Sequence, residues 1–265
     1  MCEFNTVNFC ILGMPAYFFC SFSGFVIATC TYIVLIAAKK YDLSQSIKIL
    51  LISLIGMILG AKLFGYFTGI YRSFGLGKTI TIDSLLDTGI VYYGGLLGLI
   101  GTYTFCLKRA NSNLDTHTIN VLSVCIPLFH AIARIGCFLS GCCYGKKIQG
   151  VLAVNYTVII EGSVDVNSRF PVQIAEAIFE LLIFFYLLMQ LKRSDWKDQN
   201  LLARYLTIYS VGRFFLEFLR GDMRRGLIYG VSFSQCISVL IWIVLMRCYW
   251  KRRIVQRQKR EDCNG

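Results

Sequence analysis

Residues 130–145 read HAIARIGCFLSGCCYG and place one arginine, Arg134, inside a segment apolar enough to cross a membrane. On a helix the polar and small residues of this segment recur at steps of four, three and four, so one face carries His130, Arg134, Cys137 and Gly141. A charged side chain at bilayer depth costs at least about 2.5 to 3.5 kcal/mol on insertion scales. We therefore expect this face to contact protein or water rather than lipid, and Arg134 to be paired or functional.

The composition of the whole chain is that of an integral membrane protein. The 265 residues are 56% hydrophobic and 16% charged, with a mean hydropathy of +0.60, which is too apolar for an ordinary soluble domain. A membrane span needs about 20 apolar residues. The pattern predicts an all-α polytopic membrane protein with about seven transmembrane helices, at residues 15–38, 46–68, 90–107, 118–140, 172–191, 200–219 and 230–250.

Lysine and arginine collect after alternate predicted spans. Basic pairs follow the first, third and fifth spans, and these are Lys39 with Lys40, Lys108 with Arg109, and Lys192 with Arg193. Because such residues favour the cytoplasmic side, we expect the N-terminus outside and the C-terminus in the cytoplasm. Residues 1–250 would form one transmembrane domain and residues 251–265 a basic cytoplasmic tail. The net charge of +12 fits this topology and contact with anionic lipid better than nucleic-acid binding.

The longest external connection, about residues 141–171, lies between the fourth and fifth spans. Within it VLAVNYTVII has a strand-like composition, and the EGSVDVNSR that follows is typical of a turn. We expect a small external cap here.

Two later spans also carry polar side chains in helical phase. Gln173, Glu176 and Glu180 are spaced i, i+3 and i+7 on the fifth span. One face of the sixth carries Tyr209, Arg213, Glu217 and Arg220. An internal ion-pair network that only holds the helices together is one interpretation. A phosphate site is the other, because guanidinium groups form forked hydrogen bonds with phosphate.

The start of the third span leaves two interpretations open. Tyr93 precedes Gly94 and Gly95, and bare backbone at a helix start can approach an anionic headgroup. The spacing of Gly94 and Gly98 is also typical of helix packing. The glycines alone favour packing.

Twelve cysteines occur in the chain, many of them in or next to apolar spans. Cys142 and Cys143 are adjacent, whereas zinc ligands are usually separated by two or more residues. We therefore predict no metal and no cofactor, and interpret these residues, with Cys137, as small side chains that fill a helix end. A zinc site and a redox role are the less favoured alternatives.

Five blocks of the sequence resemble one family of membrane enzymes, the prolipoprotein diacylglyceryl transferases. ARIGCFLSGCCYGK is similar to the family signature, which is close to GRIGNFxNGExxGR, and particularly to its cysteine-rich form. The other blocks occur in the family's order and are AYFFCSFSGF, VYYGGLLG, RFPVQIAEAIFE and YSVGRFFLEFLRGD.

The resemblance implies a reaction and its partners. Members of the family are seven-span enzymes of the bacterial plasma membrane. They move the diacylglyceryl group of phosphatidylglycerol to the thiol of the lipobox cysteine in a prolipoprotein, and release glycerol phosphate outside. The expected partners are therefore phosphatidylglycerol, prolipoproteins and membrane lipid.

The resemblance also implies roles for individual residues. Arg134 would bind the lipid phosphate, Arg213 and Glu217 match the essential pair of the sixth span, Tyr17 matches the essential tyrosine of the first, and Gly145 closes the signature. The other expected substrate-binding residues are Gly94, Gly95, Gln173, Glu176 and Arg220, and the other expected catalytic residues are Tyr93 and His130.

Three departures from the family pattern bear on activity. The histidine before the glycine pair is Tyr93 here, the signature asparagine is Cys137, and the acidic residue of the signature is replaced within Cys142 and Cys143. A tyrosine is a poor base near neutral pH, so His130, one turn before Arg134, is the alternative acceptor for the thiol proton. A core histidine that is hydrogen-bonded on the polar face is an equally favoured interpretation. The departures also keep a non-catalytic lipid-binding paralogue open, beside a small-solute transporter, against which the lack of an internal repeat argues.

Overall fold

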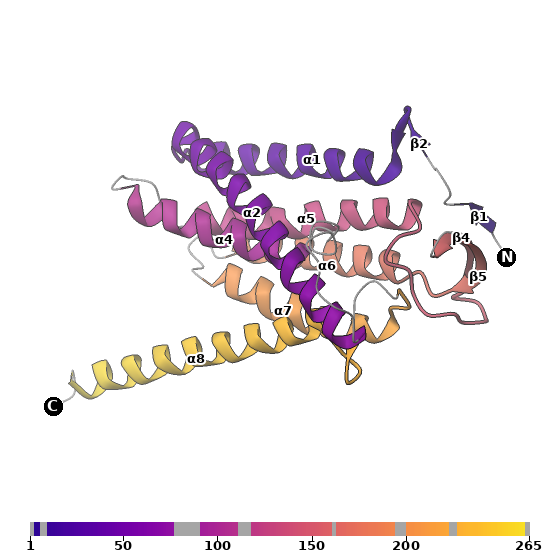
Figure 1. Ribbon diagram of the computed structural model, residues 1–265. Coiled ribbons are helices and arrows are strands. Elements are labelled where there is room, and N and C mark those ends of the chain that lie inside the picture. The colour runs from indigo at the N-terminus through magenta and orange to yellow at the C-terminus, as the bar shows by residue number, and fades with distance from the viewer. Residues whose placement is uncertain are drawn as a thin grey trace.

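The computed structural model describes residues 3–5, 10–76, 91–110, 118–160, 163–193, 200–222 and 227–262. Within these ranges the chain is a bundle of seven α-helices with short strands at one end (Figure 1). The helices are α1 (Ala16–Ala38), α2 (Leu43–Leu76), α4 (Tyr92–Arg109), α5 (Thr118–Leu139), α6 (Val172–Arg193), α7 (Leu201–Leu216) and α8 (Phe233–Asp262). Residues 161–162 of the expected external loop and 263–265 of the expected tail lie outside the described residues.

Each predicted span corresponds to one helix, and the structure confirms a helical membrane protein. Among the described residues, five helices are long and apolar enough to cross a membrane, namely α1, α2, α5, α6 and α8. The helix α7 has only 16 residues, fewer than the roughly 20 that a span needs, and the count of seven spans stays a prediction. The boundaries differ most in α8, which continues to Asp262 because the basic tail is rich in good helix formers.

The helix α5 lies at the centre of the bundle and packs against α1 and α6. In its most apolar stretch of 18 residues, 72% of the residues are buried, against 22–44% in the corresponding stretches of the other four candidate spans. Large apolar side chains on the outer helices are exposed, as lipid-facing side chains would be, including Phe22, Leu59, Phe185 and Leu240.

The strands gather at one end of the bundle (Figure 1). The hairpin of β4 (Val154–Ile160) and β5 (Ser163–Arg169) lies between α5 and α6. The strand-like composition of VLAVNYTVII is confirmed by β4, whereas the turn predicted for the stretch that follows is wrong, because residues 163–169 pair with β4 as a second strand. A third strand, β1 (Glu3–Asn5), pairs in parallel with β4. Short hairpins precede α1 and α8 at the same end, β2 (Cys10–Ile11) with β3 (Met14–Pro15) and β6 (Leu227–Ile228) with β7 (Val231–Ser232).

The predicted basic clusters lie away from the strands. The helices α1, α4, α6 and α8 begin near the strand end and run to the opposite end, where α8 terminates (Figure 1). Lys39, Arg109 and Arg193 lie at the far ends of α1, α4 and α6. The predicted basic pairs that follow α1, α4 and α6 therefore lie at the end of the bundle opposite the strands.

Glycines bring α2 and α4 into close contact. A Cβ atom on Gly98 would lie 2.1 Å from the carbonyl oxygen of Gly56, and one on Gly94 would lie 2.3 Å from that of Gly60. Backbones can approach this closely only where both helices lack side chains. Gly94 and Gly98 are therefore packing residues, as their spacing indicates.

Replacing Gly98 with valine should separate α2 from α4, because its Cβ meets backbone that cannot rotate away. We expect a loss of about 1–3 kcal/mol in stability, measured as a lower midpoint of thermal unfolding in detergent. Gly101→Val is the matched control, because nothing lies within 4 Å of its Cβ position on the same helix. Equal midpoints for the two variants would contradict the close contact.

Candidate active site

The buried charges converge where α5 and α7 end and α6 begins, at the end of the bundle that carries the strands. Glu176 Oε2 lies 3.0 Å from Arg134 Nε and 3.7 Å from Arg213 Nη1. All three residues are at most 8% exposed. One carboxylate on α6 thus links arginines from two other helices.

His130 is held on both sides by charged groups. Its Nε2 atom lies 3.0 Å from Arg134 Nε, and its Nδ1 atom lies 2.7 Å from Glu180 Oε1. A guanidinium group can only donate, so Nε2 accepts from Arg134 and the neutral ring carries its proton on Nδ1, which donates to Glu180. The ring therefore fixes the orientation of Arg134.

The second part of the charge cluster is at the end of α7. Arg213 Nη2 pairs with Glu217 Oε2 at 2.7 Å, and Arg220 Nη1 lies 3.8 Å from the same oxygen. Arg220 also donates through Nε and Nη2 to both oxygens of Asp222, at 2.9 and 2.8 Å. The Nε and Nη2 atoms of Arg220 are therefore occupied by the carboxylate of Asp222.

Two donors in the cluster have no hydrogen-bond partner among the described residues. They are Arg213 Nη1 and the Tyr209 hydroxyl, one helical turn apart on α7, and both are buried. The terminal nitrogens of Arg134 make one such contact within the same part of the chain, from Nη1 to Cys137 Sγ at 3.9 Å. Guanidinium and phenol donors thus remain available to an anionic group.

The predicted Tyr93 lies at the edge of the charge cluster, where it interacts electrostatically with Arg213, Glu176 and Glu180. Its hydroxyl is 2.7 Å from Ser238 Oγ on α8, and its ring packs on Tyr209. The preceding residue, Tyr92, stacks on His130 with ring centroids 3.6 Å apart. Tyr92 is not among the predicted site residues, and no signal in the sequence distinguishes it from Tyr93.

Gly145 joins the loop after α5 to the end of α7. It forms a β-bridge with Arg220, and a Cβ there would lie 2.1 Å from the carbonyl oxygen of Phe170. Gln173 supports the same loop, because its Nε2 donates to the carbonyl of Cys142 at 2.8 Å. These two predicted substrate-binding residues hold the loop that follows α5 against the end of α7 and the start of α6.

Tyr17 begins α1 beside the last turn of α5. A Cβ on Gly136 would lie 3.3 Å from Tyr17 Cα, and Tyr17 interacts electrostatically with Cys137, Cys142 and Arg134. Its side chain is 47% exposed, so it lies at the margin of the site. Gly94 and Gly95 face α2 instead, and their predicted role toward a headgroup stays a prediction.

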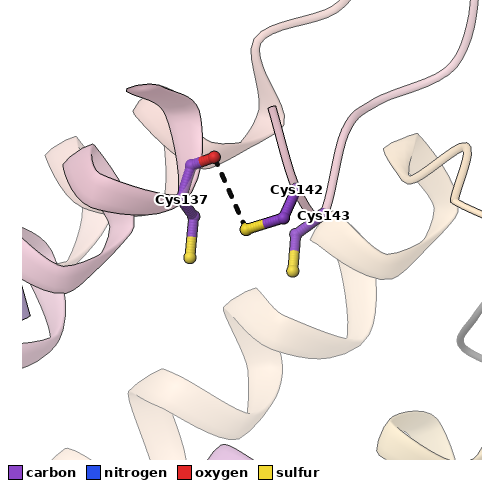
Figure 2. Close-up of side chains that lie close together, drawn as sticks. All are labelled: Cys137, Cys142 and Cys143. Carbon is purple, nitrogen blue, oxygen red and sulfur yellow. Dashed lines mark hydrogen bonds between the residues drawn. The ribbon is translucent and has the colours of Figure 1, made fainter. Parts of the chain in front are cut away.

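The thiols of Cys137, Cys142 and Cys143 lie close together (Figure 2), and Arg134 Nη1 lies 3.9 Å from Cys137 Sγ. Hydrogen bonds from Cys137 and Cys142, followed by the charges of Arg220 and Arg134, hold the pKa of the Cys143 thiol below its ordinary value although burial opposes this. The thiols are the side chains here that could hold a metal ion.

Most residues of the cluster are predicted from the sequence, but not all. The structure brings five predicted site residues together with His130, namely Arg134, Glu176, Arg213, Glu217 and Arg220. Glu180 and Asp222 were missed as site residues, although the spacing of Glu180 from Gln173 indicates a shared face.

Comparison with known proteins places the chain in a family. The family model for prolipoprotein diacylglyceryl transferase matches residues 6–251. A phosphatidylglycerol–prolipoprotein diacylglyceryl transferase from Clostridium tetani is 33% identical, over 78% of this chain and 80% of that protein. Proteins of the same name from Clostridium perfringens and Campylobacter lari are 29% and 27% identical, over 88% and 95% of both chains. The chain therefore belongs to the prolipoprotein diacylglyceryl transferase family.

Proposed function

We propose that this protein transfers the diacylglyceryl group of phosphatidylglycerol to the lipobox cysteine of a prolipoprotein. The thiolate sulfur attacks the diacylglyceryl carbon that bears the phosphate, a C–S bond forms, the C–O bond breaks, and glycerol phosphate leaves with the electron pair. The observation that carries the proposal is a pair of buried donors beside Arg134, Arg213 Nη1 and the Tyr209 hydroxyl, that have no hydrogen-bond partner among the described residues. Arg213 Nη1 has only an ion-pair contact, with Glu176 Oε2 at 3.7 Å. Such donors suit a phosphate oxygen on which negative charge grows.

The contacts of Arg134 support a role in phosphate binding. His130 and Glu176 both engage its Nε atom at 3.0 Å, so the guanidinium plane is fixed by one edge. The opposite edge carries the two terminal nitrogens, which form the fork that matches phosphate oxygens. Pre-orientation of this kind favours the transition state because no side-chain reorganisation is needed when charge develops.

His130 acts in this proposal as a positioning residue. Its Nε2 lone pair is engaged by Arg134, so the ring can accept a thiol proton only if that bond is given up. Two carboxylates of α6 reinforce the arrangement, because Glu180 accepts from Nδ1 of the ring and Glu176 pairs with Arg134 Nε. The sequence-based alternative, in which His130 is the proton acceptor, predicts a different pH dependence and can be tested separately.

We also propose that the strand end of the bundle faces outward, with the β4–β5 hairpin as an external cap. The basic ends of α1, α4, α6 and α8 lie away from that end, and such residues favour the cytoplasm. The charge cluster would then lie near the outer leaflet of the bacterial plasma membrane, where glycerol phosphate is released.

Arg134→Lys should lower transfer by at least about 100-fold, because a lysine keeps the charge but loses the fork. The assay supplies phosphatidylglycerol and a peptide with a lipobox cysteine, and detects the thioether-linked product by mass spectrometry. Arg109→Ala, an exposed arginine at the far end of α4, should leave the rate unchanged. Full activity of Arg134→Lys would contradict phosphate binding, and tight lipid binding by a wild-type protein that forms no product would favour the non-catalytic paralogue.

Replacing His130 distinguishes positioning from proton transfer. We expect His130→Ala to reduce the rate while the shape of the pH–rate profile stays the same, and His130→Gln, which keeps one donor and one acceptor, to restore part of the rate. If the rise in rate with pH that wild type shows disappears in both variants, His130 is the base.

Orientation can be tested on whole cells. A green fluorescent protein fused after residue 265 should fluoresce, because the fold of this reporter matures in the cytoplasm. The exposed Cys10 of β2 should react with a membrane-impermeant maleimide, and Cys10→Ser supplies the background. A dark fusion together with an unreactive Cys10 would reverse the proposed topology.

A further inference from the structure

Three thiols converge at the strand end of α5 (Figure 2). The Sγ atoms of Cys137, Cys142 and Cys143 all lie within 4.8 Å of one another. In the part of the chain that the structure describes, this is the only group of three or more histidine, cysteine or acidic side chains placed closely enough to share a metal ion. The remaining described cysteines do not belong to such a group.

A tight turn of the backbone produces this convergence. Cys137 is in the last turn of α5, and the chain then reverses through Gly141 and Cys143, whose φ angles are +64° and +56°. A positive φ costs a residue with a side chain roughly 1–2 kcal/mol. Gln173 holds the turn through its hydrogen bond to the Cys142 carbonyl, and the Cys142 thiol lies 3.6 Å from the Cys137 carbonyl oxygen. The surrounding contacts thus maintain a strained conformation that brings three thiols close together.

The spacing of the thiols suits a thiophilic cation. Zinc–sulfur bonds are about 2.3 Å long, so sulfurs at three corners of a tetrahedron are about 3.8 Å apart. The observed separations need to close by at most about 1 Å to reach this geometry. We propose that Cys137, Cys142 and Cys143 form a binding site for a thiophilic divalent cation such as Zn²⁺, with three thiolate ligands and a fourth position open.

The charges around the thiols favour such a complex. Three thiolates and one divalent cation carry a net charge of −1, and the thiol protons pass to solvent on binding. Arg134 Nη1 lies 3.9 Å from Cys137 Sγ, and Arg220 attracts a negative charge on Cys143. The two guanidinium groups therefore compensate the charge of the filled site.

The exposure of the thiols allows exchange with the surroundings. Cys137 is buried, whereas Cys142 and Cys143 are half-buried. Three protein ligands with an open fourth position are typical of zinc sites that bind a water or an external ligand. A cation here would thus hold a water beside Arg134.

The proposal is tested by metal binding, without reference to transfer activity. The purified full-length protein, in detergent with a non-thiol reductant, is titrated with Co²⁺ and observed through its thiolate charge-transfer absorption. We expect one Co²⁺ per chain. The zinc-loaded wild type should give three sulfur neighbours at about 2.3 Å by X-ray absorption, and this measurement requires no variant. One sulfur or none would overturn the proposal.

Two matched variants locate the site. Replacing Cys137, Cys142 and Cys143 with serine should weaken Co²⁺ binding by at least about 100-fold, because even loss of a supporting residue costs 10- to 100-fold at metal sites. Replacing Cys106, Cys236 and Cys248, which removes the same number of thiols elsewhere, should change nothing. Equal affinities in the two variants would overturn the proposal, as would a disulfide within the trio that persists in the reductant. If the first variant does not fold, Cys142→Ser alone should still remove one sulfur from the X-ray absorption count.

Discussion

An arginine buried in an apolar helix bundle has to be compensated, and this constraint organises the protein. Arg134 lies on the central helix and is 8% exposed. An unpaired charge at that depth destabilises a protein by several kcal/mol. Its carboxylate partner, Glu176, comes from α6 and is shared with Arg213 of α7. The need to neutralise one side chain therefore fixes how three helices meet at one end of the bundle.

Compensation also explains why the cluster is extended rather than a single pair. Glu176 and Glu180 are separated by one turn on α6, and His130 lies against both. His130 is neutral, accepts a hydrogen bond from Arg134 and donates one to Glu180. It therefore connects the arginine to the carboxylate through hydrogen bonds without adding a charge. Each polar group thus orients the next, and the guanidinium plane of Arg134 is fixed before any ligand arrives.

Hydropathy and helical phase predict much of this arrangement. Twenty-residue apolar segments fix the helices, and polar residues at helical spacing on three spans predict that Arg134, Glu176 and Arg213 face one another, because they cannot face lipid. The exact rotation of a helix about its axis cannot be predicted in this way. Tyr92 and Tyr93 are adjacent and chemically identical, and only the packing of α4 decides that Tyr92 contacts His130 while Tyr93 reaches Ser238. The close approach of the three thiols cannot be predicted from the spacing of the cysteines along the chain. It depends on a backbone turn with positive φ angles at Gly141 and Cys143.

The hydrogen bonds of the cluster bear on whether it only holds helices together. Nearly all buried polar groups in folded proteins have a partner, and those that do not call for an explanation. An ion-pair network with a purely structural role would gain from pairing every donor, since an unpaired buried donor costs roughly 1–3 kcal/mol. Arg213 Nη1 and the Tyr209 hydroxyl are buried without a hydrogen-bond partner among the described residues, one turn apart on the same helix and beside Arg134. The same cluster also contains carboxylate oxygens without a hydrogen-bond partner, on Glu176, Glu180 and Glu217, so its internal pairing is incomplete on both sides. The proposed phosphate would pair the two donors, which is why this incomplete pairing fits a binding site better than a network that only holds helices together.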